Sequence, residues 1–480
     1  MNAASHNASH NASHHAPDSA SPPVGHSGAV VQLRSEMPVS AERLFAWHEM
    51  PGAFERLTPG FMPAKVAARS GGIRDGARVS LDVPVGPVSM RWEMEHTGYV
   101  AGREFRDVQR SGPFAKWEHT HRMEPLTAET SVLDDRIEYA LPVPPFGALV
   151  AGHFTRQKLE RLMRWRHALT RLDLERHARY ASRGARTVAV TGASGFLGAA
   201  LVPFLTTGGH AVRSVGRGAE NDIRWDPSRG TFDASALEGV DAVIHLAGAS
   251  VAERWTPEHK RAIRESRINS TRMIAEACAK LTVKPEVLIC GSAVGIYGSR
   301  GDEVLDESSS LGDDFLATVG KEWEAAAQPA LDAGIRVVFL RTGIVLNPSG
   351  GALGKMVLPF QAGVGGTLGS GKAWMSWISR EDWVGATYHA LQTPAVSGAL
   401  NLTAPEPVTG STFATTLGRV LHRPTLVPVP AIVLTTIFGE MARGTILASQ
   451  RALPKGLEGA GFTFAHPTLS SALRFELGLL

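Results

Sequence analysis

The sequence predicts an α/β fold, in which a doubly wound parallel sheet with a small C-terminal lobe follows an α+β unit. Two observations support this prediction. From Thr187 onward, short apolar strand patterns alternate with helical patterns and glycine-rich turns, which is typical of a parallel sheet covered by helices. Between Val30 and Arg179, several strand patterns follow one another and end in one long amphipathic helix, which is typical of an α+β unit.

The composition is that of a globular protein with two or three domains. The chain has 480 residues, of which 43% are hydrophobic and 20% charged. Its net charge of +3 is too balanced to predict binding to nucleic acid or to an anionic membrane, so a small molecule is the expected partner. No apolar run reaches the roughly 18 residues of a membrane span. The two cysteines, Cys278 and Cys290, lie in apolar surroundings typical of reduced thiols, which fits a cytoplasmic protein.

Residues 1–28 form a low-complexity tail that we expect to be disordered. Asn-Ala-Ser-His repeats run from Asn2 to His15, and a stretch rich in proline, serine and glycine follows. The tail lacks the basic start and apolar stretch of a signal peptide. Because binding a metal ion would cost this tract its conformational freedom, we assign no metal role to the histidines of the repeats, which are His6, His10, His14 and His15.

Residues 29–179 are expected to form the α+β unit. The last segment, Phe146–His177, places leucines and Met163 along one side of a helix, so this helix must pack on the sheet. The other expected elements are an opening strand at Val30–Leu33, a helix at Ala41–Phe54, and strands at Arg74–Met94, Gly98–Gln109, Lys116–Met123 and Ser131–Tyr139.

This unit resembles the helix-grip superfamily of START-like and polyketide cyclase domains. The resemblance rests on the element order, on the segment Pro38–Phe45 after the first strand, and on Trp117-Glu118-His119 in a late strand. It implies a curved antiparallel sheet around the C-terminal helix, with an apolar pocket that captures a hydrophobic ligand. The alternative is a unit that only packs or dimerises. We interpret His119, His121 and His153 as ordinary strand or helix residues, and we predict no metal site.

After a polar linker at residues 180–186, a glycine motif joins a strand to a helix. The apolar strand Thr187–Val190 leads into Gly192, Gly195 and Gly198, and the helix continues through Leu205. A helix N-terminus offers free N–H groups and a partial positive charge to a pyrophosphate, provided that no side chain blocks the approach. We therefore predict a dinucleotide site whose loop comprises Gly192, Ala193, Ser194, Gly195, Phe196, Leu197 and Gly198.

The next two strands predict which dinucleotide binds. The strand His210–Val215 ends in Gly216-Arg217, without the acidic residue that would hydrogen-bond a ribose 2′-hydroxyl. Arg217, with Arg213 nearby, favours a 2′-phosphate and hence NADP(H) over NAD(H), unless Arg217 is only a solvated surface charge. A further buried strand ends in small residues that would let the adenosine side approach, namely Leu246, Ala247 and Gly248.

Residues 187–480 resemble the extended short-chain dehydrogenase/reductases. The matching segments are TGASGFLG at 191–198, HLAG at 245–248, Gly291–Gly298 and Leu340–Gly343. Within that superfamily the chain resembles the epimerase-family branch through Arg254-Trp255, Gly350–Met356, Trp377-Ile378 and Gln450–Lys455. This resemblance implies a seven-stranded Rossmann sheet, a bound nicotinamide cofactor, and a C-terminal lobe from about residue 400 over the nicotinamide end.

The catalytic residues that the resemblance implies are incomplete. Ser292 matches the serine that orients a carbonyl or hydroxyl, and Lys321, in a helix expected at Asp313–Ala327, takes the place of the lysine. The proton-exchanging tyrosine is missing, because Ala317 stands four residues before Lys321. Tyr297 is the nearest candidate, either for proton transfer or for shaping the site. Lys321 would hold the ribose or remain a solvated helix lysine.

Two functions remain open from the sequence. The first is an NADP(H)-dependent oxidoreductase or epimerase-like enzyme that acts on an apolar carbonyl or alcohol. The second is a sensor that binds NADPH or another ligand without turnover, which the alanine at position 317 favours. Both interpretations leave room for a homodimer, and neither identifies the substrate.

Overall fold

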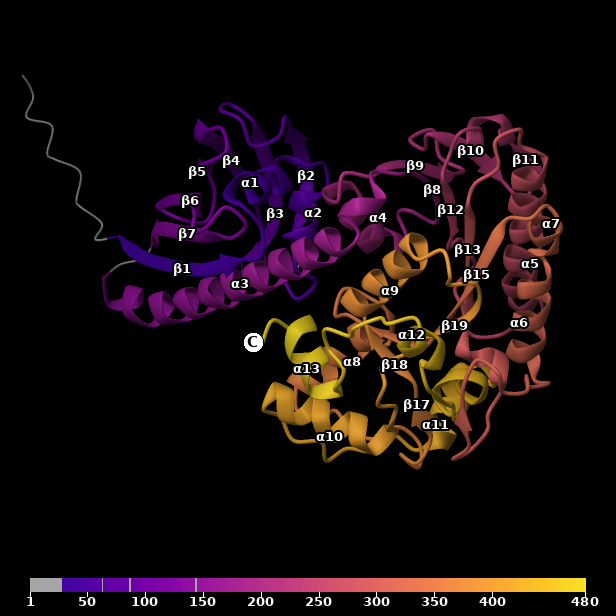
Figure 1. The fold of residues 1–480 in the computed structure, drawn as a ribbon. Coiled ribbons are helices and arrows are strands. Elements are labelled where there is room, and N and C mark those ends of the chain that lie inside the picture. The colour runs from indigo at the N-terminus through magenta and orange to yellow at the C-terminus, as the bar shows by residue number, and fades with distance from the viewer. Residues whose placement is uncertain (1–27, 63, 86–87, 143–144) are drawn as a thin grey trace, which may run out of the picture.

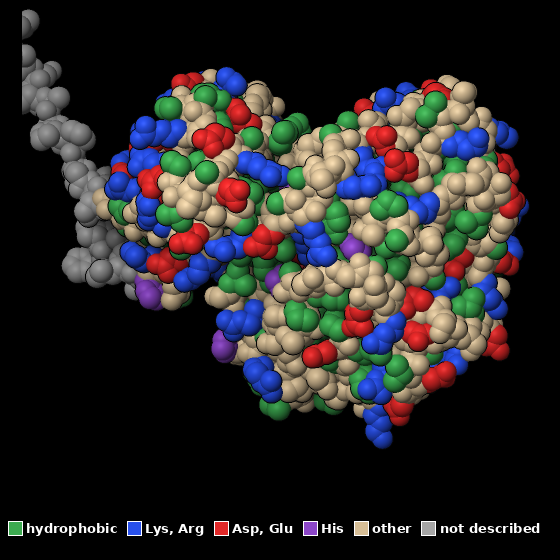
Figure 2. Space-filling view, in the orientation of Figure 1, with side chains coloured by type: hydrophobic (Ala, Val, Ile, Leu, Met, Phe, Trp, Pro, Cys, Tyr) green, Lys and Arg blue, Asp and Glu red, His purple; other side chains and the backbone are tan. Residues whose placement is uncertain are grey.

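The computed structural model describes residues 28–62, 64–85, 88–142 and 145–480. These residues form two large sheets, each with its own helices (Figure 1). The first sheet has seven strands in the order β1-β7-β6-β5-β4-β3-β2, and all neighbours whose pairing is described are antiparallel. The second has eight strands in the order β11-β10-β9-β8-β12-β13-β15-β19. On the face in view, acidic and basic side chains are interspersed, and a notch separates the two parts (Figure 2).

The N-terminal sheet is built from strands whose side chains alternate between its two faces. In β6, for example, Trp117, His119, His121 and Met123 are buried in alternation with more exposed residues. The strands are β1 (Ala29–Met37), β2 (Lys65–Ser70), β3 (Arg78–Val85), β4 (Val88–Val100), β5 (Glu104–Ser111), β6 (Lys116–Pro125) and β7 (Ser131–Ala140).

Three short-range details differ from the expectation. The helix expected at Ala41–Phe54 is two helices, α1 (Ala41–Glu49) and α2 (Ala53–Arg56), because the backbone becomes extended at Met50, the residue before Pro51. The single strand expected at Arg74–Met94 is the hairpin of β3 and β4, in which Val85 pairs with Val88. The exposed strand β2 was not expected at all.

The long helix α3 (Pro145–Arg179) runs along this sheet, as the amphipathic pattern predicted (Figure 1). Its buried residues Leu159 and Met163 pack with Val31, Ile137 and Tyr139 of the sheet. Removing such side chains from water is the main stabilisation of the sheet-helix contact, at about 1.5–3 kcal/mol for each fully buried large apolar side chain.

The parallel sheet agrees with the expected architecture. Seven parallel strands are present, and the short strand β11 adds to the edge by pairing antiparallel with β10. The strands are β8 (Thr187–Thr191), β9 (Ala211–Gly216), β10 (Ile223–Asp226), β11 (Thr231–Phe232), β12 (Ala242–His245), β13 (Val287–Ala293), β15 (Arg336–Thr342) and β19 (Gly398–Leu402).

Helices cover both faces of the parallel sheet. Strand β13 shows this directly, because Val287 and Ile289 contribute to one apolar core while Leu288 and Cys290 contribute to the other. The helices α4 (Gly198–Thr207) and α9 (Arg380–Gln392) lie on the first face. The helices α5 (Pro257–Lys280) and α7 (Gln328–Asp332) lie on the second, and α6 (Phe315–Ala325) packs beside α5. A single 3₁₀ turn, Ala234–Leu237, connects β11 to β12.

The C-terminal lobe takes residues from before position 400 as well as after it. Its core combines Leu353 and Trp377 with Phe413, Leu417 and Leu473. Its helices are α8 (Gly351–Gln361), α10 (Gly410–Leu421), α11 (Ala431–Phe438), α12 (Lys455–Gly459) and α13 (Leu469–Glu476). Short strands complete it: β14 (Val304–Leu305), β16 (Ile344–Leu346), β17 (Trp374–Met375), β18 (Trp377–Ser379), β20 (Val408–Thr409) and β21 (Arg451–Ala452).

Buried charges join the two halves of the chain. The guanidinium of Arg56 on α2 lies 2.6 Å from Asp173 of α3 and 2.6 Å from Glu381 of α9. A second pair joins Arg176 to Asp382 at 2.9 Å. Burial would raise the pKa of Glu381, but the nearby arginines lower it to about 2; burial of Asp173 outweighs Arg56 and keeps its pKa raised. Buried ion pairs therefore connect the two halves.

None of the helices in the described ranges combines the length and the apolar character that a membrane crossing requires.

Candidate functional site

The carboxyl ends of β8, β12 and β13 meet at one edge of the parallel sheet. Strand β8 lies between β9 and β12, so the chain's connections diverge on its two sides at this edge. Ligands of open parallel sheets bind at such a point, outside the carboxyl ends of the strands. The glycine loop after β8, the segment after β12 and Ser292 at the end of β13 therefore share one edge.

The glycines of the loop are required by its conformation and by its close packing. Gly192 has φ +68, and a Cβ atom there would lie 3.1 Å from the backbone nitrogen of Ala247. At Gly198, where α4 begins, a Cβ would lie 2.2 Å from the carbonyl oxygen of Gly192 and 2.7 Å from Ala193 Cα. The intervening Ser194 and Gly195 are exposed, which leaves the N-terminal end of α4 open to a ligand.

A buried histidine holds the neighbouring segment in place. His245 Nδ1 lies 2.7 Å from Thr191 Oγ1, and its Nε2 lies 3.0 Å from Ser270 Oγ. Thr191 Oγ1 accepts hydrogen bonds from the backbone N–H groups of Leu246 and Ala247. Burial lowers the pKa of His245 to about 4, so the ring is neutral near pH 7. Leu246 and Ala247 are therefore fixed beside the glycine loop, and Gly248 follows them.

Two arginines occur at the far end of this edge, and they differ in their contacts. Arg213 on β9 donates a hydrogen bond to the carbonyl of Ala236 at 3.0 Å. Arg217 follows the end of β9 directly, and its side chain is exposed. The structure thus leaves Arg217 available to a ligand at the position where the acidic residue of an NAD site would stand.

Arg267 on α5 is a cation near this edge that the sequence analysis did not single out. Its guanidinium lies 3.5 Å from where a Cβ of Gly248 would be, and it stacks on the Trp323 ring at 5.0 Å. Burial alone lowers its pKa to about 10, because no described carboxylate compensates for the lost water. A partly buried guanidinium that has no described carboxylate partner, beside the segment after β12, is suited to bind an anionic ligand.

Ser292 belongs to a hydrogen-bonded network of buried polar groups. Its Oγ donates to Glu324 Oε1 at 2.7 Å, and Arg341 holds the same carboxylate through two hydrogen bonds of 2.9 Å each. Glu324 lies on α6 and Arg341 on β15, so three elements meet here. Sequence reasoning missed both residues, although Arg341 stands in a motif it quoted. A charged residue in a buried strand signals that a partner must lie nearby.

Tyr297 lies in the same network with its hydroxyl already engaged. The hydroxyl donates to Asn401 Oδ1 at 2.7 Å and accepts from Arg341 Nη1 at 3.0 Å. The side chain is fully buried, and this burial raises its pKa. Of the two roles considered from the sequence, this geometry favours shaping the site over proton transfer.

Ala317 and Lys321 lie on the same helix but differ in burial. Ala317 is buried in the first turn of α6, where its N–H donates to the N-cap residue Asp314 at 2.9 Å. Lys321 is exposed on the same helix and does not join the described hydrogen bonds of Ser292.

The glycine loop also contacts the C-terminal lobe. Phe196 of the loop packs against Gly350 of the lobe, where a Cβ atom would lie 2.7 Å from the Phe196 ring. The structure thus brings the loop, the lobe and Ser292 to one side.

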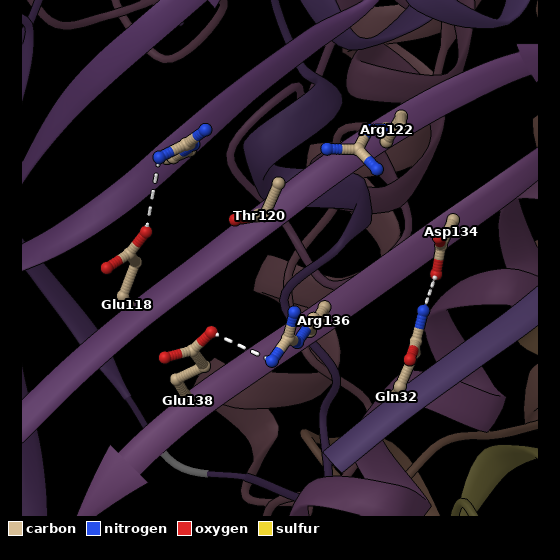
Figure 3. Close-up of a pocket in the computed structure, with 8 residues that line it drawn as sticks. Gln32, Glu118, Thr120, Arg122, Asp134, Arg136 and Glu138 are labelled. Atoms are coloured by element: carbon tan, nitrogen blue, oxygen red, sulfur yellow. Dashed lines mark hydrogen bonds and ion pairs between the residues drawn. The ribbon is translucent and has the colours of Figure 1, made fainter. Parts of the chain in front are cut away.

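A separate polar depression lies on the outer face of the N-terminal sheet. Its lining includes charged residues from neighbouring strands, among them the pair Arg136–Glu138 at 3.0 Å and the hydrogen bond from Gln32 to Asp134 at 2.7 Å (Figure 3). These side chains point away from α3 and neutralise one another across the strands. We interpret them as a solvated sheet face, which needs no ligand to explain it.

The fold and this edge define a Rossmann-like α/β protein with a nucleotide-binding type of glycine loop. Comparison with known proteins identifies its family. Residues 188–402 match the model of the NAD dependent epimerase/dehydratase family, and residues 429–476 match a C-terminal domain of unknown function, DUF1731. An epimerase family protein of Mycobacterium bovis is 44% identical over 292 residues, which cover 96% of that protein and 60% of this chain. This chain therefore belongs to the NAD(P)-dependent epimerase family.

Two solved structures are similar to this chain over different extents. A nucleoside-diphosphate sugar epimerase from Corynebacterium glutamicum has a TM-score of 0.78 and 32% identity, with 94% of this chain and 90% of that chain covered. The human epimerase family protein SDR39U1, solved with NADPH, has a TM-score of 0.57 and 33% identity, with 61% of this chain and 100% of that chain covered. The Corynebacterium likeness therefore extends well beyond the family's nucleotide-binding part.

Proposed function

We propose that this protein is an NADP(H)-dependent oxidoreductase or epimerase-like enzyme that acts on a carbonyl or alcohol of a small molecule. The observation that carries the proposal is the edge of the parallel sheet, where the glycine loop is open and Arg217 follows β9 in place of an acidic residue. The human relative solved with NADPH supports the preference for the phosphorylated cofactor.

The residues at this edge fit a dinucleotide. The loop from Gly192 to Gly198 would hold the pyrophosphate at the N-terminus of α4, because its glycines leave backbone N–H groups uncovered. Arg217 would pair with the 2′-phosphate, and Arg267 would add positive charge beside Gly248. The small residues Ala247 and Gly248 would leave room for the adenosine side.

Ser292 is the residue best placed to orient a substrate oxygen. When bound, the cofactor would supply or accept a hydride at the nicotinamide C4. The Ser292 hydroxyl donates to Glu324, and it can turn to donate to a substrate oxygen while Arg341 holds the carboxylate in place. The proton that accompanies hydride transfer would come from the substrate or from water, since Ala317 supplies none and the Tyr297 hydroxyl is engaged.

A sensor without turnover is the second candidate function. The observation that favours it is the replacement of the expected tyrosine by the buried Ala317, together with the enclosed hydroxyl of Tyr297. In this alternative the edge of the sheet still binds NADPH, and the N-terminal half reports its binding through the buried contacts of Arg56 and Arg176.

We also propose that residues 29–179 form a helix-grip domain that binds a hydrophobic ligand and presents it to the second half. The antiparallel sheet with a long helix along it is the arrangement that this proposal requires. The Corynebacterium structure, whose likeness covers 94% of this chain, supports a common two-part architecture.

Turnover on a substrate panel distinguishes the enzyme from the sensor. NADPH consumption would be followed with aldehydes and quinones, and product formation with nucleoside-diphosphate sugars, because an epimerase regenerates its cofactor. The proteins compared are the wild type, Ser292→Ala, and the control Ser310→Ala in an exposed loop. An enzyme should lose turnover about tenfold or more in Ser292→Ala with unchanged NADPH affinity, because one oriented hydrogen bond is removed. Equal turnover in both variants would remove Ser292 from the mechanism. Tight NADPH binding without turnover on the whole panel would favour the sensor.

A further inference from the structure

The inner face of the N-terminal sheet carries a cluster of histidine and aspartate side chains. Asp107 of β5 is the register partner of His119 on β6, and His121 of β6 is the partner of Asp135 on β7. His119 and His121 are two residues apart, so the strand's period of two turns both inward. The cluster also includes His96 of β4 and His167 of α3. Four strands and the long helix thus direct polar groups to one buried place.

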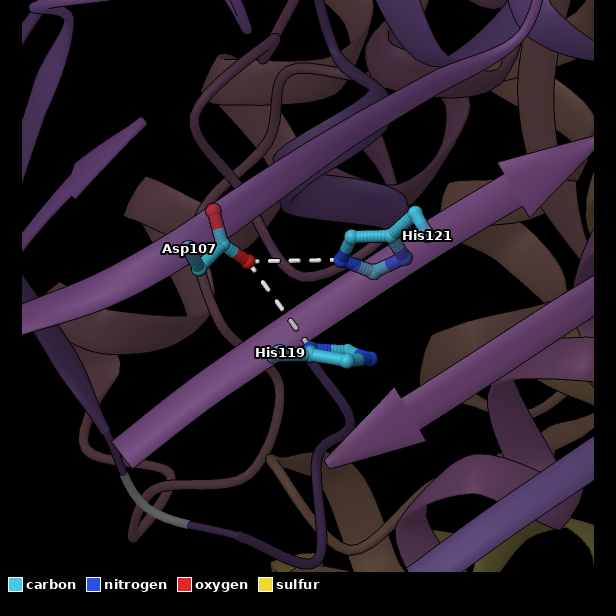
Figure 4. A group of neighbouring side chains, drawn as sticks. All are labelled: Asp107, His119 and His121. Atoms are coloured by element: carbon cyan, nitrogen blue, oxygen red, sulfur yellow. Dashed lines mark hydrogen bonds and ion pairs between the residues drawn. The ribbon is translucent and has the colours of Figure 1, made fainter. Parts of the chain in front are cut away.

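We propose that Asp107, His119 and His121 bind one divalent transition-metal ion of the zinc class. Each offers one ligand atom, and these atoms all lie within 4.8 Å of one another (Figure 4). Asp107 Oδ2 is 3.3 Å from His121 Nε2 and 3.8 Å from His119 Nδ1. A tetrahedral ion with bonds of about 2.0–2.1 Å separates its ligands by about 3.3 Å. The three groups are therefore close to the spacing that an ion between them would impose.

His119 is the group that the protein alone leaves without a partner. Its side chain is only 2% exposed, and its Nε2 has no hydrogen-bond partner among the described residues. Its two ring nitrogens each lie 3.8 Å from a carboxylate oxygen, which is too far for a hydrogen bond. A buried imidazole without a hydrogen bond costs free energy. An ion bound at Nδ1, the nitrogen nearer Asp107, would recover part of that cost and leave Nε2 facing Asp135.

The other two groups are held as metal ligands usually are. Asp135 Oδ1 lies 2.8 Å from His121 Nδ1, which directs the opposite nitrogen, Nε2, toward Asp107. His96 Nε2 lies 2.8 Å from Asp107 Oδ1 and leaves Oδ2 toward the histidines. His167 in turn holds the second oxygen of Asp135 at 3.1 Å. Metal-bound histidines characteristically give their other nitrogen to a carboxylate in this way.

The donor set identifies the class of ion. Two imidazoles and one carboxylate suit zinc and neighbouring transition metals, whereas magnesium and calcium prefer oxygen ligands alone. Three protein ligands leave a fourth position for water or for an oxygen of a bound molecule. Phe105 stacks on His121 with 4.4 Å between ring centroids, so an apolar wall limits how the cluster can rearrange.

Metal titration of the full-length chain tests this site. Because the tail histidines could bind metal independently, they would be replaced by serine in every sample (His6→Ser, His10→Ser, His14→Ser, His15→Ser and His26→Ser). This chain would be stripped with a chelator and titrated with Zn²⁺ calorimetrically and with Co²⁺ by visible absorption. The variants are His119→Ala and Asp107→Asn, with His153→Ala, an exposed histidine of α3, as the matched control.

We expect one Zn²⁺ per chain and the intense visible bands of tetrahedral Co²⁺. Affinity should fall at least a hundredfold in His119→Ala and Asp107→Asn, and it should be unchanged in His153→Ala. A folded chain that binds no Zn²⁺, or one whose His119→Ala variant retains full affinity, would overturn the proposal. If the variants do not fold, the test uses the parent chain alone. Zn²⁺ should raise its melting temperature. An unchanged melting temperature, or the weak visible bands of octahedral Co²⁺, would refute the site.

Discussion

The edge of the parallel sheet and the interior of the antiparallel sheet are candidate sites for opposite reasons. At the edge, glycines make room by lacking side chains, and a Cβ at position 198 would lie 2.2 Å from backbone. In the interior, side chains from four strands and a helix converge, and Asp107, His119 and His121 place ligand atoms within 4.8 Å. The first site depends on one local segment of chain, whereas the second depends on strand pairing across the sheet.

This difference determines how each site responds to mutation. A change in the glycine loop should affect ligand binding and leave the N-terminal half intact. A change in the histidine cluster should affect metal binding and leave the nucleotide edge intact. Glu381 contacts Arg56 of the N-terminal half, so a change at Glu381 should affect both halves.

The largest expected effect is on stability, from Glu381→Gln at the junction of the halves. The pKa of Glu381 is about 2 in the folded protein, against 4.5 as the ordinary value. Because the folded pKa is lower, the ionised carboxylate stabilises the fold above pH 4.5, and the contribution is lost as the pH falls toward 2. The variant should lose about 3–5 kcal/mol of unfolding free energy at pH 7, the usual cost of removing one partner from a buried ion pair.

Chemical denaturation at several pH values measures this effect. The difference between wild type and Glu381→Gln should shrink as the pH is lowered from 4.5 to 2. The control is Glu322→Gln, which breaks the exposed pair with Arg264 and should cost no more than about 1 kcal/mol. A difference that stays constant over this pH range would show that the charge of Glu381 does not join the halves.

The second effect is loss of nucleotide binding in Gly198→Ala. The added methyl group would displace the carbonyl of Gly192 and the backbone of Ala193, so we expect NADPH affinity to fall about a hundredfold or more. Gly459→Ala is the matched control, because a Cβ there meets no atom within 4 Å. Fluorescence titration with NADPH provides the comparison, and equal affinity in both variants would contradict the role of the loop.

The sequence predicted the parallel sheet and its glycine loop because these features are local. The strand, the three glycines and the helix occupy consecutive positions, so spacing alone identifies them. The cluster of Asp107, His119 and His121 was missed because it forms only when β5 pairs with β6 in one register. A one-residue shift would turn both histidines to the outer face. Glu324 was also missed because its contacts form only in the fold: it lies on the helix α6, whereas its partners Ser292 and Arg341 lie on two strands.

A smaller effect is expected from Arg267→Met. Its guanidinium lies beside Gly248 without a described carboxylate, so we expect it to contribute to cofactor phosphate binding. Removing it should weaken NADPH and NADH equally, by about tenfold, because the shared pyrophosphate loses one charge-assisted contact. Arg272→Met, an exposed arginine of the same helix, is the control. If Arg267→Met lowers the affinity for NADPH but not for NADH, Arg267 contacts the 2′-phosphate and not the pyrophosphate.

The most direct test of the account is a titration of the protein with NADPH and NADH, followed by nicotinamide fluorescence, in wild type, Arg217→Ala and the exposed control Arg229→Ala. We predict that NADPH binds more than about tenfold more tightly than NADH, that Arg217→Ala removes this preference, and that Arg229→Ala keeps it. Binding of neither nucleotide to the folded wild type, or a preference for NADPH that survives in Arg217→Ala, would contradict the assignment of this edge.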